Sequence, residues 1–546
     1  MKKEDKTNIK ISILFLLIIA IFTISIVPRE FQNDTFFNIS IGKYILENGI
    51  DMQEHFSWVS GLTYTYSHWA FDVLIYLIYS KFNFMGIYVF TIIFSICINA
   101  TIYILINKSS KNSIVSLFIT LMVAFLNSHN YTARSQIVSF LCFIIEYYCI
   151  EKFVETDNKK YGIIIFILGI IIANFHAATW PLMFILFLPH IGAAFFNFFS
   201  SKNIYTKLKQ KSEKKLEKIS VDSPKHSKIL EDIEIYNKII SKENQKQSYK
   251  IEKKSNYNLK HLIILMIITI FSGLITPIKD VPFTYIIKSM FGHSNFGNAK
   301  SIAYISEMQH FIPIGHASFL IFIVILVEFL IFLPSKLKLE HGFLILGLLI
   351  MTLSSNRYLA LLIFIGSFVL SDLITQCFTI YVAENIYPVE VFLTSPVVAL
   401  ILVIVTSAYS ISTIIENKNI DFVNEKLYPI EATNYILENI DYQNMRIYNS
   451  YNFGSYLMLN NIPVFIDSRL DVYCSEFNNT DVFHNYIDIV SDLEYYEDVF
   501  SKYDFTHILL KNDEVILKYL KRDTNYTILY EDEYFTLFER NIANPE

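Results

Sequence analysis

The chain has 546 residues, of which 53% are hydrophobic and 16% aromatic, and its formal net charge at neutral pH is -6. Long apolar runs in so hydrophobic a composition exclude an ordinary soluble globular protein and indicate a polytopic membrane protein. The five cysteines show neither metal-ligand spacing nor a disulfide framework; they are Cys97, Cys142, Cys149, Cys377 and Cys474.

The first apolar run, at about 11–27, follows a lysine-rich start. That start is typical of a signal peptide, but no small-residue cleavage site follows the run, so we expect a retained first membrane span. Further apolar segments lie near 84–106, 113–128, 134–152, 161–175, 177–197, 259–277, 314–334, 341–355, 357–373 and 393–412. The sequence therefore predicts about eleven transmembrane helices in a membrane domain over 1–413.

Lysine distribution predicts the orientation of these spans. If the N-terminus is cytoplasmic, four of the five cytoplasmic loops contain lysine; those loops are 107–112, 153–160, 198–258, 335–340 and 374–392. The positive-inside rule then places everything after 413 outside the cell membrane. The Lys-rich insert over 198–258 indicates a solvated helical hairpin near anionic lipid headgroups. Nucleic-acid binding is the weaker alternative, because the lysines lack interleaved aromatic residues and a recognisable binding module.

The outer loop over 28–83 carries two predicted membrane-surface helices. In the first, Asp34 precedes a helical pattern from Phe36 to Ile45, and Gly49 follows as a stop signal. The second, over 68–82, is apolar almost all round but shorter than the roughly 20 residues that a span needs.

The outer connections hold nearly all the unusual polar residues of the membrane domain. They include Asp34, Glu54, His55, His68, His129, Arg134, Asn174, His176, Glu307, His310 and Arg357. A single histidine at a helix end is more often a packing residue than a catalyst. Their clustering, however, predicts a polar site open to the outer face, because ionisable groups near a membrane usually mark function.

From 414 to 546 the composition is that of a soluble α/β domain. The stretch 431–440 is helical, and 445–451, 453–461 and 463–469 alternate as strand, helix and strand, which favours a parallel pair. Later stretches predict further strands and a closing hairpin. Asp467, Arg469 and Asp471 stand where a predicted strand ends, so they form either a ligand site or a structural ion pair.

This order of features resembles the GT-C superfamily of membrane glycosyltransferases, and most closely its bacterial mannosyltransferase-like (RgtA/B/C/D-like) group. The matching strings are Asp34-Thr-Phe-Phe, Glu54-His-Phe-Ser57, His68-Trp69, Ala133-Arg134-Ser-Gln136, Asn174-Phe-His176, Thr276-Pro277, Ser306-Glu307, Asn356-Arg357, Asn449-Ser-Tyr-Asn-Phe-Gly454 and Phe465-Ile-Asp-Ser-Arg469-Leu-Asp471. Ser135 and Ser468 depart from the proline and glycine that the group tends to have there.

The resemblance implies transfer of a sugar from a polyprenyl-phosphate donor to a cell-envelope glycan, lipid or protein. Such transfer needs a base for the acceptor hydroxyl and cationic groups for the leaving phosphate. Asp34, alone or with Glu54, is the candidate base, and Arg134 and Arg357 are candidates for the phosphate. Further substrate-binding candidates are His68, Trp69, His176 and Glu307. A divalent metal is a possible cofactor, although no ligand spacing requires one.

Two other functions remain open from the sequence. A transporter or flippase of lipid-linked saccharides would have a cavity reachable from both sides of the membrane and internal repeats. A non-catalytic envelope scaffold would tolerate the loss of Asp34 and Arg134.

Overall fold

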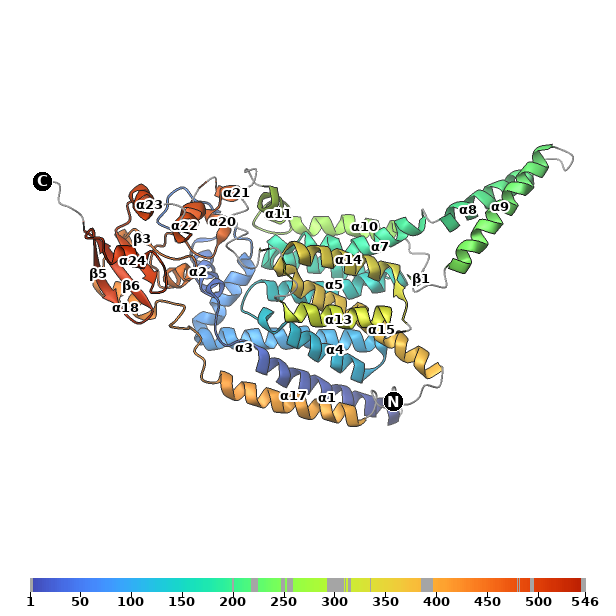
Figure 1. Ribbon diagram of the computed structural model, residues 1–546, viewed down its shortest axis with the longest axis horizontal. Coiled ribbons are helices and arrows are strands. Elements are labelled where there is room, and N and C mark those ends of the chain that lie inside the picture. The colour runs from blue at the N-terminus through green and yellow to red at the C-terminus, as the bar shows by residue number, and fades with distance from the viewer. Residues whose placement is uncertain are drawn as a thin grey trace.

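The structure is a computed structural model that describes residues 3–198, 201–217, 224–246, 251–252, 259–291, 309, 311–312, 316–333, 335–383, 396–478, 480, 482–491 and 495–541. Its helices form an elongated bundle (Figure 1). An α/β region that contains the C-terminal strands lies at one end of the bundle, and a helical hairpin projects from the other end, where the chain also begins.

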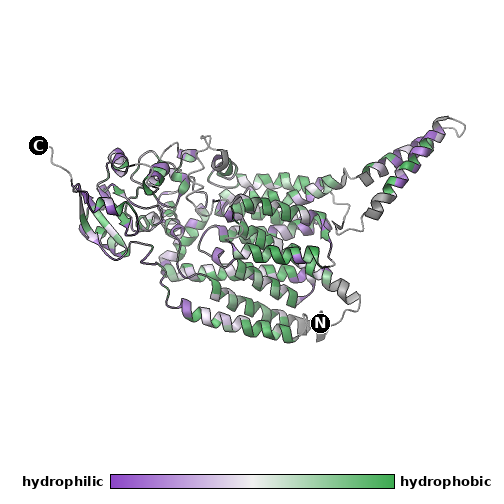
Figure 2. Ribbon diagram, in the orientation of Figure 1, coloured by the Kyte–Doolittle hydropathy of each residue, from purple (hydrophilic) through white to green (hydrophobic). Residues whose placement is uncertain are grey.

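The bundle is built from long helices that coincide with the predicted apolar segments. They are α1 (Lys3–Ile26), α3 (Trp69–Ser110), α4 (Ser113–Leu126), α5 (Gln136–Thr156), α6 (Lys159–Phe175), α7 (Leu182–Phe198), α10 (Leu259–Ile270), α13 (Ala317–Ile331), α14 (Leu339–Ser354), α15 (Leu359–Ala383) and α17 (Pro396–Asn417). Short 3-10 turns lie between or beside them: η1 (Ser128–Asn130), η2 (Ala177–Thr179), η3 (Phe271–Leu274) and η5 (Asn356–Tyr358). Figure 2 shows that these helices are predominantly hydrophobic.

Within the described residues, four helical segments are both long and apolar enough to cross a membrane: Trp69–Ser110, Ala177–Phe196, Asn356–Cys377 and Leu400–Asn417. Five further apolar helical segments are shorter: Ile11–Ile26, Ser113–Leu126, Leu259–Leu274, Ala317–Ile331 and Leu339–Ser354. The helices thus occur where the sequence predicts them, whereas the number of eleven spans stays a prediction.

The outer loop forms a helix that joins the bundle to the α/β region. This helix, α2 (Asn33–Asn48), ends at Gly49, whose φ of 87° lies in the left-handed region that glycine tolerates best. On one side α2 packs against α3, and on the other against α19 (Gly454–Leu459) of the α/β region. Helix α3 is broken at Asn83, where φ is 51°. The predicted helix stop and the predicted separation of 68–82 from the following span therefore both have structural counterparts.

The Lys-rich insert contains two helices, α8 (Ser201–Leu216) and α9 (Pro224–Lys246). They contact each other along the projecting hairpin, and the rings of Tyr205 and Tyr236 lie 5.7 Å apart (Figure 1). Where the chain returns to the bundle, the two-residue strands β1 (Ile251–Glu252) and β2 (Leu337–Lys338) pair in parallel. The hairpin prediction is therefore confirmed, and its place in the cell stays a prediction.

The α/β region has a four-stranded sheet of order β3-β4-β6-β5, in which β3 and β4 are parallel and the other pairs antiparallel. The strands are β3 (Ile447–Tyr448), β4 (His507–Lys511), β5 (Tyr526–Glu531) and β6 (Phe535–Arg540). Helices and one 3-10 turn surround the sheet: α18 (Ile430–Asn439), η6 (Tyr442–Asn444), α19, α20 (Leu470–Tyr473), α21 (Ser475–Asn478), α22 (Val482–Val490), α23 (Tyr496–Tyr503) and α24 (Leu517–Leu520).

One strand prediction is wrong. The stretch 463–469 forms no strand of the sheet, and β3 takes its parallel partner from β4 instead. The reason is that a side chain holds this stretch: Asn449 Nδ2 donates to the Ile466 carbonyl at 2.7 Å, and the Phe465 backbone N–H donates to Asn449 Oδ1 at 2.9 Å. Val464 alone makes an isolated parallel bridge, to Ser57 of the outer loop.

Candidate active site

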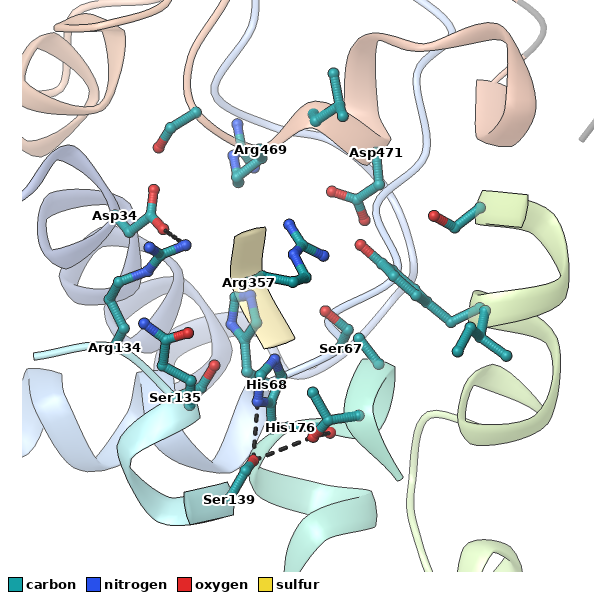
Figure 3. A pocket seen from close by; sticks show the side chains of 18 of the residues that line it. Asp34, Ser67, His68, Arg134, Ser135, Ser139, His176, Arg357, Arg469 and Asp471 are labelled. Atoms are coloured by element: carbon teal, nitrogen blue, oxygen red, sulfur yellow. Dashed lines mark hydrogen bonds and ion pairs between the residues drawn. The ribbon is translucent and has the colours of Figure 1, made fainter. Parts of the chain in front are cut away.

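A cavity of about 740 Å³ lies where the bundle meets the α/β region (Figure 3). Its lining comes from α2, the start of α3, the N-terminal end of α5, η2, α11 (Val281–Phe291), η5 and the segment 468–477. It contains seven of the predicted site residues: Asp34, His68, Arg134, His176, Arg357, Arg469 and Asp471. Apolar side chains complete the part beside the bundle, including Phe140, Phe143, Leu182 and Leu361. One cavity thus combines charged groups with an apolar wall.

Asp34 reaches the cavity from the first turn of α2. The helix begins at Asn33, with Gln32 in the N-cap position, so Asp34 is not the cap, although the helix dipole still favours a carboxylate there. A close contact fixes the position of the helix, because a Cβ added at Gly42 would lie 2.1 Å from the Asp72 carbonyl oxygen. Glycine at that position therefore allows α2 to lie directly against the first turn of α3.

Asp34 forms an ion pair with Arg134, from the loop that precedes α5. Arg134 Nη2 and Asp34 Oδ2 are 2.7 Å apart, and each side chain is 21% exposed. The pair orients the carboxylate and leaves it accessible from the cavity. The two residues are far apart in the sequence, so their pairing depends on the fold.

His68 is the N-cap residue of α3 and pairs with Asp72 one turn later. Its Nδ1 lies 3.0 Å from both carboxylate oxygens. Burial alone would lower the pKa of His68, but the charge and hydrogen bond of Asp72 raise that pKa above its ordinary value. Asp72 therefore stabilises the protonated form of His68 at the edge of the cavity.

His176 has the opposite character. Its Nδ1 is 2.9 Å from Ser139 Oγ, which in turn is 3.1 Å from Thr179 Oγ1. Burial, together with the positive charges of His68 and two arginines, lowers the pKa of His176 well below its usual range. His176 therefore stays neutral and can exchange hydrogen bonds with an uncharged group.

Arg357 and Asp471 enter the cavity from different elements. Figure 3 shows the Arg357 side chain, carried by η5, reaching into the space between the walls. Asp471 belongs to α20, is 8% exposed, and accepts a hydrogen bond of 2.7 Å from Thr65 Oγ1. Burial raises the pKa of Asp471. The α/β region thus supplies an acidic side chain to the wall opposite the bundle.

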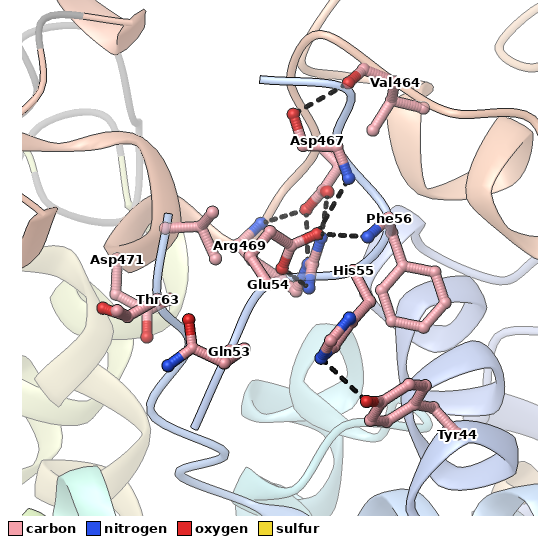
Figure 4. A network of polar contacts seen from close by, with 12 residues as sticks. Tyr44, Gln53, Glu54, His55, Phe56, Thr63, Val464, Asp467, Arg469 and Asp471 are labelled. Atoms are coloured by element: carbon pink, nitrogen blue, oxygen red, sulfur yellow. Dashed lines mark hydrogen bonds and ion pairs between the residues drawn. The ribbon is translucent and has the colours of Figure 1, made fainter. Parts of the chain in front are cut away.

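Glu54, Asp467 and Arg469 form a buried network (Figure 4), and Arg469 connects this network to the cavity wall. Arg469 Nη1 and Nη2 donate to the two Glu54 oxygens at 2.6 and 2.9 Å, and Arg469 Nε and Nη2 donate to Asp467 at 2.9 and 2.6 Å. All three side chains are at most 1% exposed. Burial would lower the pKa of Arg469, but the two carboxylates raise it above its usual value. The network holds the outer loop against the α/β region.

Two sequence strings interlock beside this network. The Asn449 side chain forms hydrogen bonds with the backbone of residues 465 and 466. The backbone at Gly454 also lies close to this stretch, because a Cβ added there would lie 2.0 Å from the Ile466 carbonyl oxygen. The string from Asn449 to Gly454 is therefore a support for the segment that carries Asp467, Arg469 and Asp471.

Three predicted site residues that the structure describes do not line the cavity, and a fourth lies outside the described residues. Glu54 and Asp467 belong to the buried network. Trp69 instead connects α3 to α6, since its indole Nε1 donates a hydrogen bond to Asn174 Oδ1 at 3.1 Å. Glu307 lies outside the described residues.

No protein-family model matches the chain, and no curated protein sequence matches it. The fold, however, is similar to that of oligosaccharyltransferase AglB from Archaeoglobus fulgidus. Its complex with an inhibitory peptide and a dolichol-phosphate has 12% sequence identity and a TM-score of 0.53, and the match covers 92% of this chain and 69% of that chain. The form tethered to an acceptor peptide has the same identity and coverage, and its TM-score is 0.54. The chain therefore shares its fold with these structures.

Several cavity residues were missed by sequence reasoning. Asp72 does not itself line the cavity but pairs with His68, and it had a detectable signal, an acid one helical turn after His68 in an otherwise apolar helix. Asn38 follows Asp34 by one turn on α2 and also lines the cavity. Ser139 and Tyr285 carry no distinctive sequence signal, because each lies in a segment that reads only as apolar helix or loop.

The sequence left a divalent metal as a possible cofactor, and the described residues contain no ligand set for one. Within the described ranges, no group of three or more His, Cys, Asp or Glu side chains is arranged to hold a metal ion.

Proposed function

We propose that this protein is a membrane glycosyltransferase of the bacterial mannosyltransferase-like group. It moves a sugar from a polyprenyl-phosphate-linked donor to a cell-envelope glycan, lipid or protein on the outer face of the membrane. The observation that carries the proposal is the single cavity in which Asp34 and Arg134 face His68 and Arg357.

The two sides of the cavity suit the two parts of such a donor. Phe140, Phe143 and Leu361 offer an apolar surface beside the bundle, as a polyprenyl chain requires. Arg357 and the cationic His68 can hold the phosphate, because guanidinium and imidazolium groups make charge-assisted hydrogen bonds to phosphate oxygens. The AglB structures, which share this fold, contain a dolichol-phosphate in one case and an acceptor peptide in another.

Asp34 is the proposed general base. The acceptor hydroxyl oxygen bonds to the anomeric carbon of the sugar while the bond from that carbon to the phosphate oxygen breaks. The hydroxyl proton passes to Asp34, and the phosphate leaves with both electrons of the broken bond. Arg134 orients the Asp34 carboxylate through their 2.7 Å contact. Arg357 and His68 stabilise the negative charge of the leaving phosphate.

The proposed orientation places the cavity and the α/β region outside and the α8–α9 hairpin in the cytoplasm. It rests on the lysines of the cytoplasmic loops and on the position of these two parts at opposite ends of the bundle (Figure 1). Membrane lipids surround the bundle, and we propose no nucleic-acid partner.

A metal remains outside the proposed mechanism. One AglB structure is a complex with Zn and sulfate. It has 10% sequence identity to this chain and a TM-score of 0.50, and the match covers 91% of this chain and 68% of that chain. The described residues of this chain contain no group of three or more His, Cys, Asp or Glu side chains placed to hold a metal ion.

The test is Asp34→Asn in right-side-out membrane vesicles supplied with a labelled polyprenyl-phosphate sugar. Asparagine keeps the size and a hydrogen bond to Arg134 but cannot accept the proton, so incorporation of label into envelope material should fall at least about 100-fold. Glu47→Gln is the matched control, since Glu47 is an exposed acid on the same helix. Activity of Asp34→Asn within a few-fold of the parent would refute the role of Asp34 as the base.

A further inference from the structure

Asn38 is a buried polar residue without an evident structural task. It lines the cavity and is only 2% exposed. Its amide oxygen has no hydrogen-bond partner in the described part of the chain. A buried polar atom left without a partner is unfavourable for folding, so such atoms in native proteins are uncommon and call for an explanation.

The position of Asn38 relates it to the reaction centre. It follows Asp34 by four residues on α2, so the two side chains occupy one face of the helix and are separated by about 6 Å along its axis. One further turn along α2, the helix lies against the backbone of α3 at Gly42. The Phe37 ring lies 5.5 Å from that of His68, so the loop that carries Ser67 passes beside this part of the helix. Ser67 also lines the cavity.

The chemistry of this neighbourhood suits a hydroxyl group better than a phosphate or a lipid chain. A primary amide both donates and accepts hydrogen bonds, as a hydroxyl does, and rotation by half a turn exchanges its oxygen and nitrogen. Arg357 and His68 already offer positive charge for a phosphate, and Phe140 and Phe143 offer apolar surface for a lipid chain.

We infer that Asn38 binds a hydroxyl group of the transferred sugar and makes donor binding depend on that sugar. The inference rests on the proposed function, because it takes Asp34 as the group beside which the sugar reacts. Asn38 is then a specificity-determining residue, and its missing hydrogen bond is completed by the donor.

The test measures binding to the purified full-length protein in detergent, without turnover. The probes are decaprenyl phosphate without a sugar and decaprenyl phosphate carrying glucose, galactose or mannose. In the parent protein, at least one of the sugar-bearing lipids should bind more tightly than the bare lipid. Asn38→Leu has similar volume and no hydrogen-bonding group, so it should weaken that binding by about 3- to 10-fold and change binding of the bare lipid less than twofold.

A stability measurement separates ligand binding from a structural role. Because leucine removes an unpartnered polar group, the melting temperature of Asn38→Leu without lipid should equal or exceed that of the parent. Asn48→Leu is the matched control: Asn48 ends the same helix, is exposed and does not line the cavity, so this change should affect binding of neither lipid.

Three results would overturn the inference. Asn38→Leu could weaken the binding of sugar-bearing and bare lipid equally, or it could weaken the binding of neither. The parent protein could also bind no sugar-bearing lipid more tightly than the bare lipid. If the parent binds none of these lipids, the proposed function itself fails, and that failure is distinguishable because it is independent of Asn38.

Discussion

Two arginine–carboxylate contacts in this protein join distant parts of the chain, yet they differ in access to water. The pair of Asp34 and Arg134 opens on the cavity, with each side chain 21% exposed. The pair of Glu54 and Arg469 is enclosed, with each side chain 1% exposed. The same residue types thus form a pair that is accessible from a cavity in one place and an enclosed pair between two segments in the other.

Additional hydrogen bonds hold the enclosed pair in place. Glu54 Oε1 accepts hydrogen bonds from the backbone N–H groups of Phe56 and Ser57 as well as from Arg469, whose other side is occupied by Asp467. Glu54 could act as a base only by giving up these bonds. We therefore propose that Asp34 acts without Glu54, and that Glu54 positions the outer loop.

The largest expected effect tests the enclosed network. Arg469→Leu leaves Glu54 and Asp467 buried without their cation, and breaking a buried pair in this way costs about 3–5 kcal/mol. For a cooperative unit of 150–250 residues, this corresponds to a melting temperature lower by roughly 6–20 °C. Differential scanning fluorimetry of the purified protein provides the measurement.

The control for this change is Arg540→Leu, which removes an exposed contact of 2.8 Å between Arg540 and Asp504. That substitution should shift the melting temperature by a few degrees at most. Equal melting temperatures of the two variants would show that the buried network is not a structural joint.

A smaller effect on stability, but a clear one on activity, is expected at the open pair. Arg134→Gln removes the charge that orients Asp34, so transfer of labelled sugar should fall about 10- to 100-fold. Because the pair is partly exposed, the free energy of unfolding should decrease by about 1 kcal/mol or less. A loss of stability as large as that of Arg469→Leu, with activity per folded molecule retained, would contradict this assignment.

The smallest expected effect is a pH dependence that belongs to His68. Asp72, Asp471 and Asp34 are the acids that raise its pKa in the folded state against the effect of burial. The stability that this raised pKa contributes is fully present below the unfolded pKa of about 6.5 and is lost as the pH rises through the higher folded pKa. Binding of the phosphate group should weaken over the same range, because His68 loses its charge.

Titration of decaprenyl phosphate binding against pH checks this expectation. In His68→Gln the affinity should be lower at acidic pH, and its change over this range should become flat. His176 serves as the comparison, since its lowered pKa keeps it neutral across the same range. An unchanged pH profile in His68→Gln would show that another group responds to pH.

Local patterns predicted much of the fold. The apolar runs coincide with bundle helices, Gly49 ends α2, and the strands β5 and β6 form the expected hairpin. In that hairpin, Asp532 Oδ1 accepts hydrogen bonds from the backbone N–H groups of Tyr534 and Phe535. These features depend on neighbouring residues, so short stretches of sequence contain the required information.

The failed strand at 463–469 illustrates the opposite case. Its β-branched and aromatic residues favour an extended backbone, and the backbone is indeed held, but by the side chain of Asn449 and not by a neighbouring strand. Sequence patterns reflect which residues are buried and which prefer an extended backbone. The hydrogen-bond partner of a backbone group depends instead on how the elements pack.

By itself, the sequence determined the helical membrane-type bundle, the change to an α/β composition after 413 and the collection of polar residues in the outer connections. Only the tertiary structure decided which of those residues share the cavity: it brought Asp34 to Arg134 and assigned Glu54 to Arg469. It also placed Asn38 in the cavity wall, where its oxygen has no partner among the described residues. The physical reason is that periodicity and capping are short-range properties, while ion pairing and access to water depend on contacts between elements far apart in the chain.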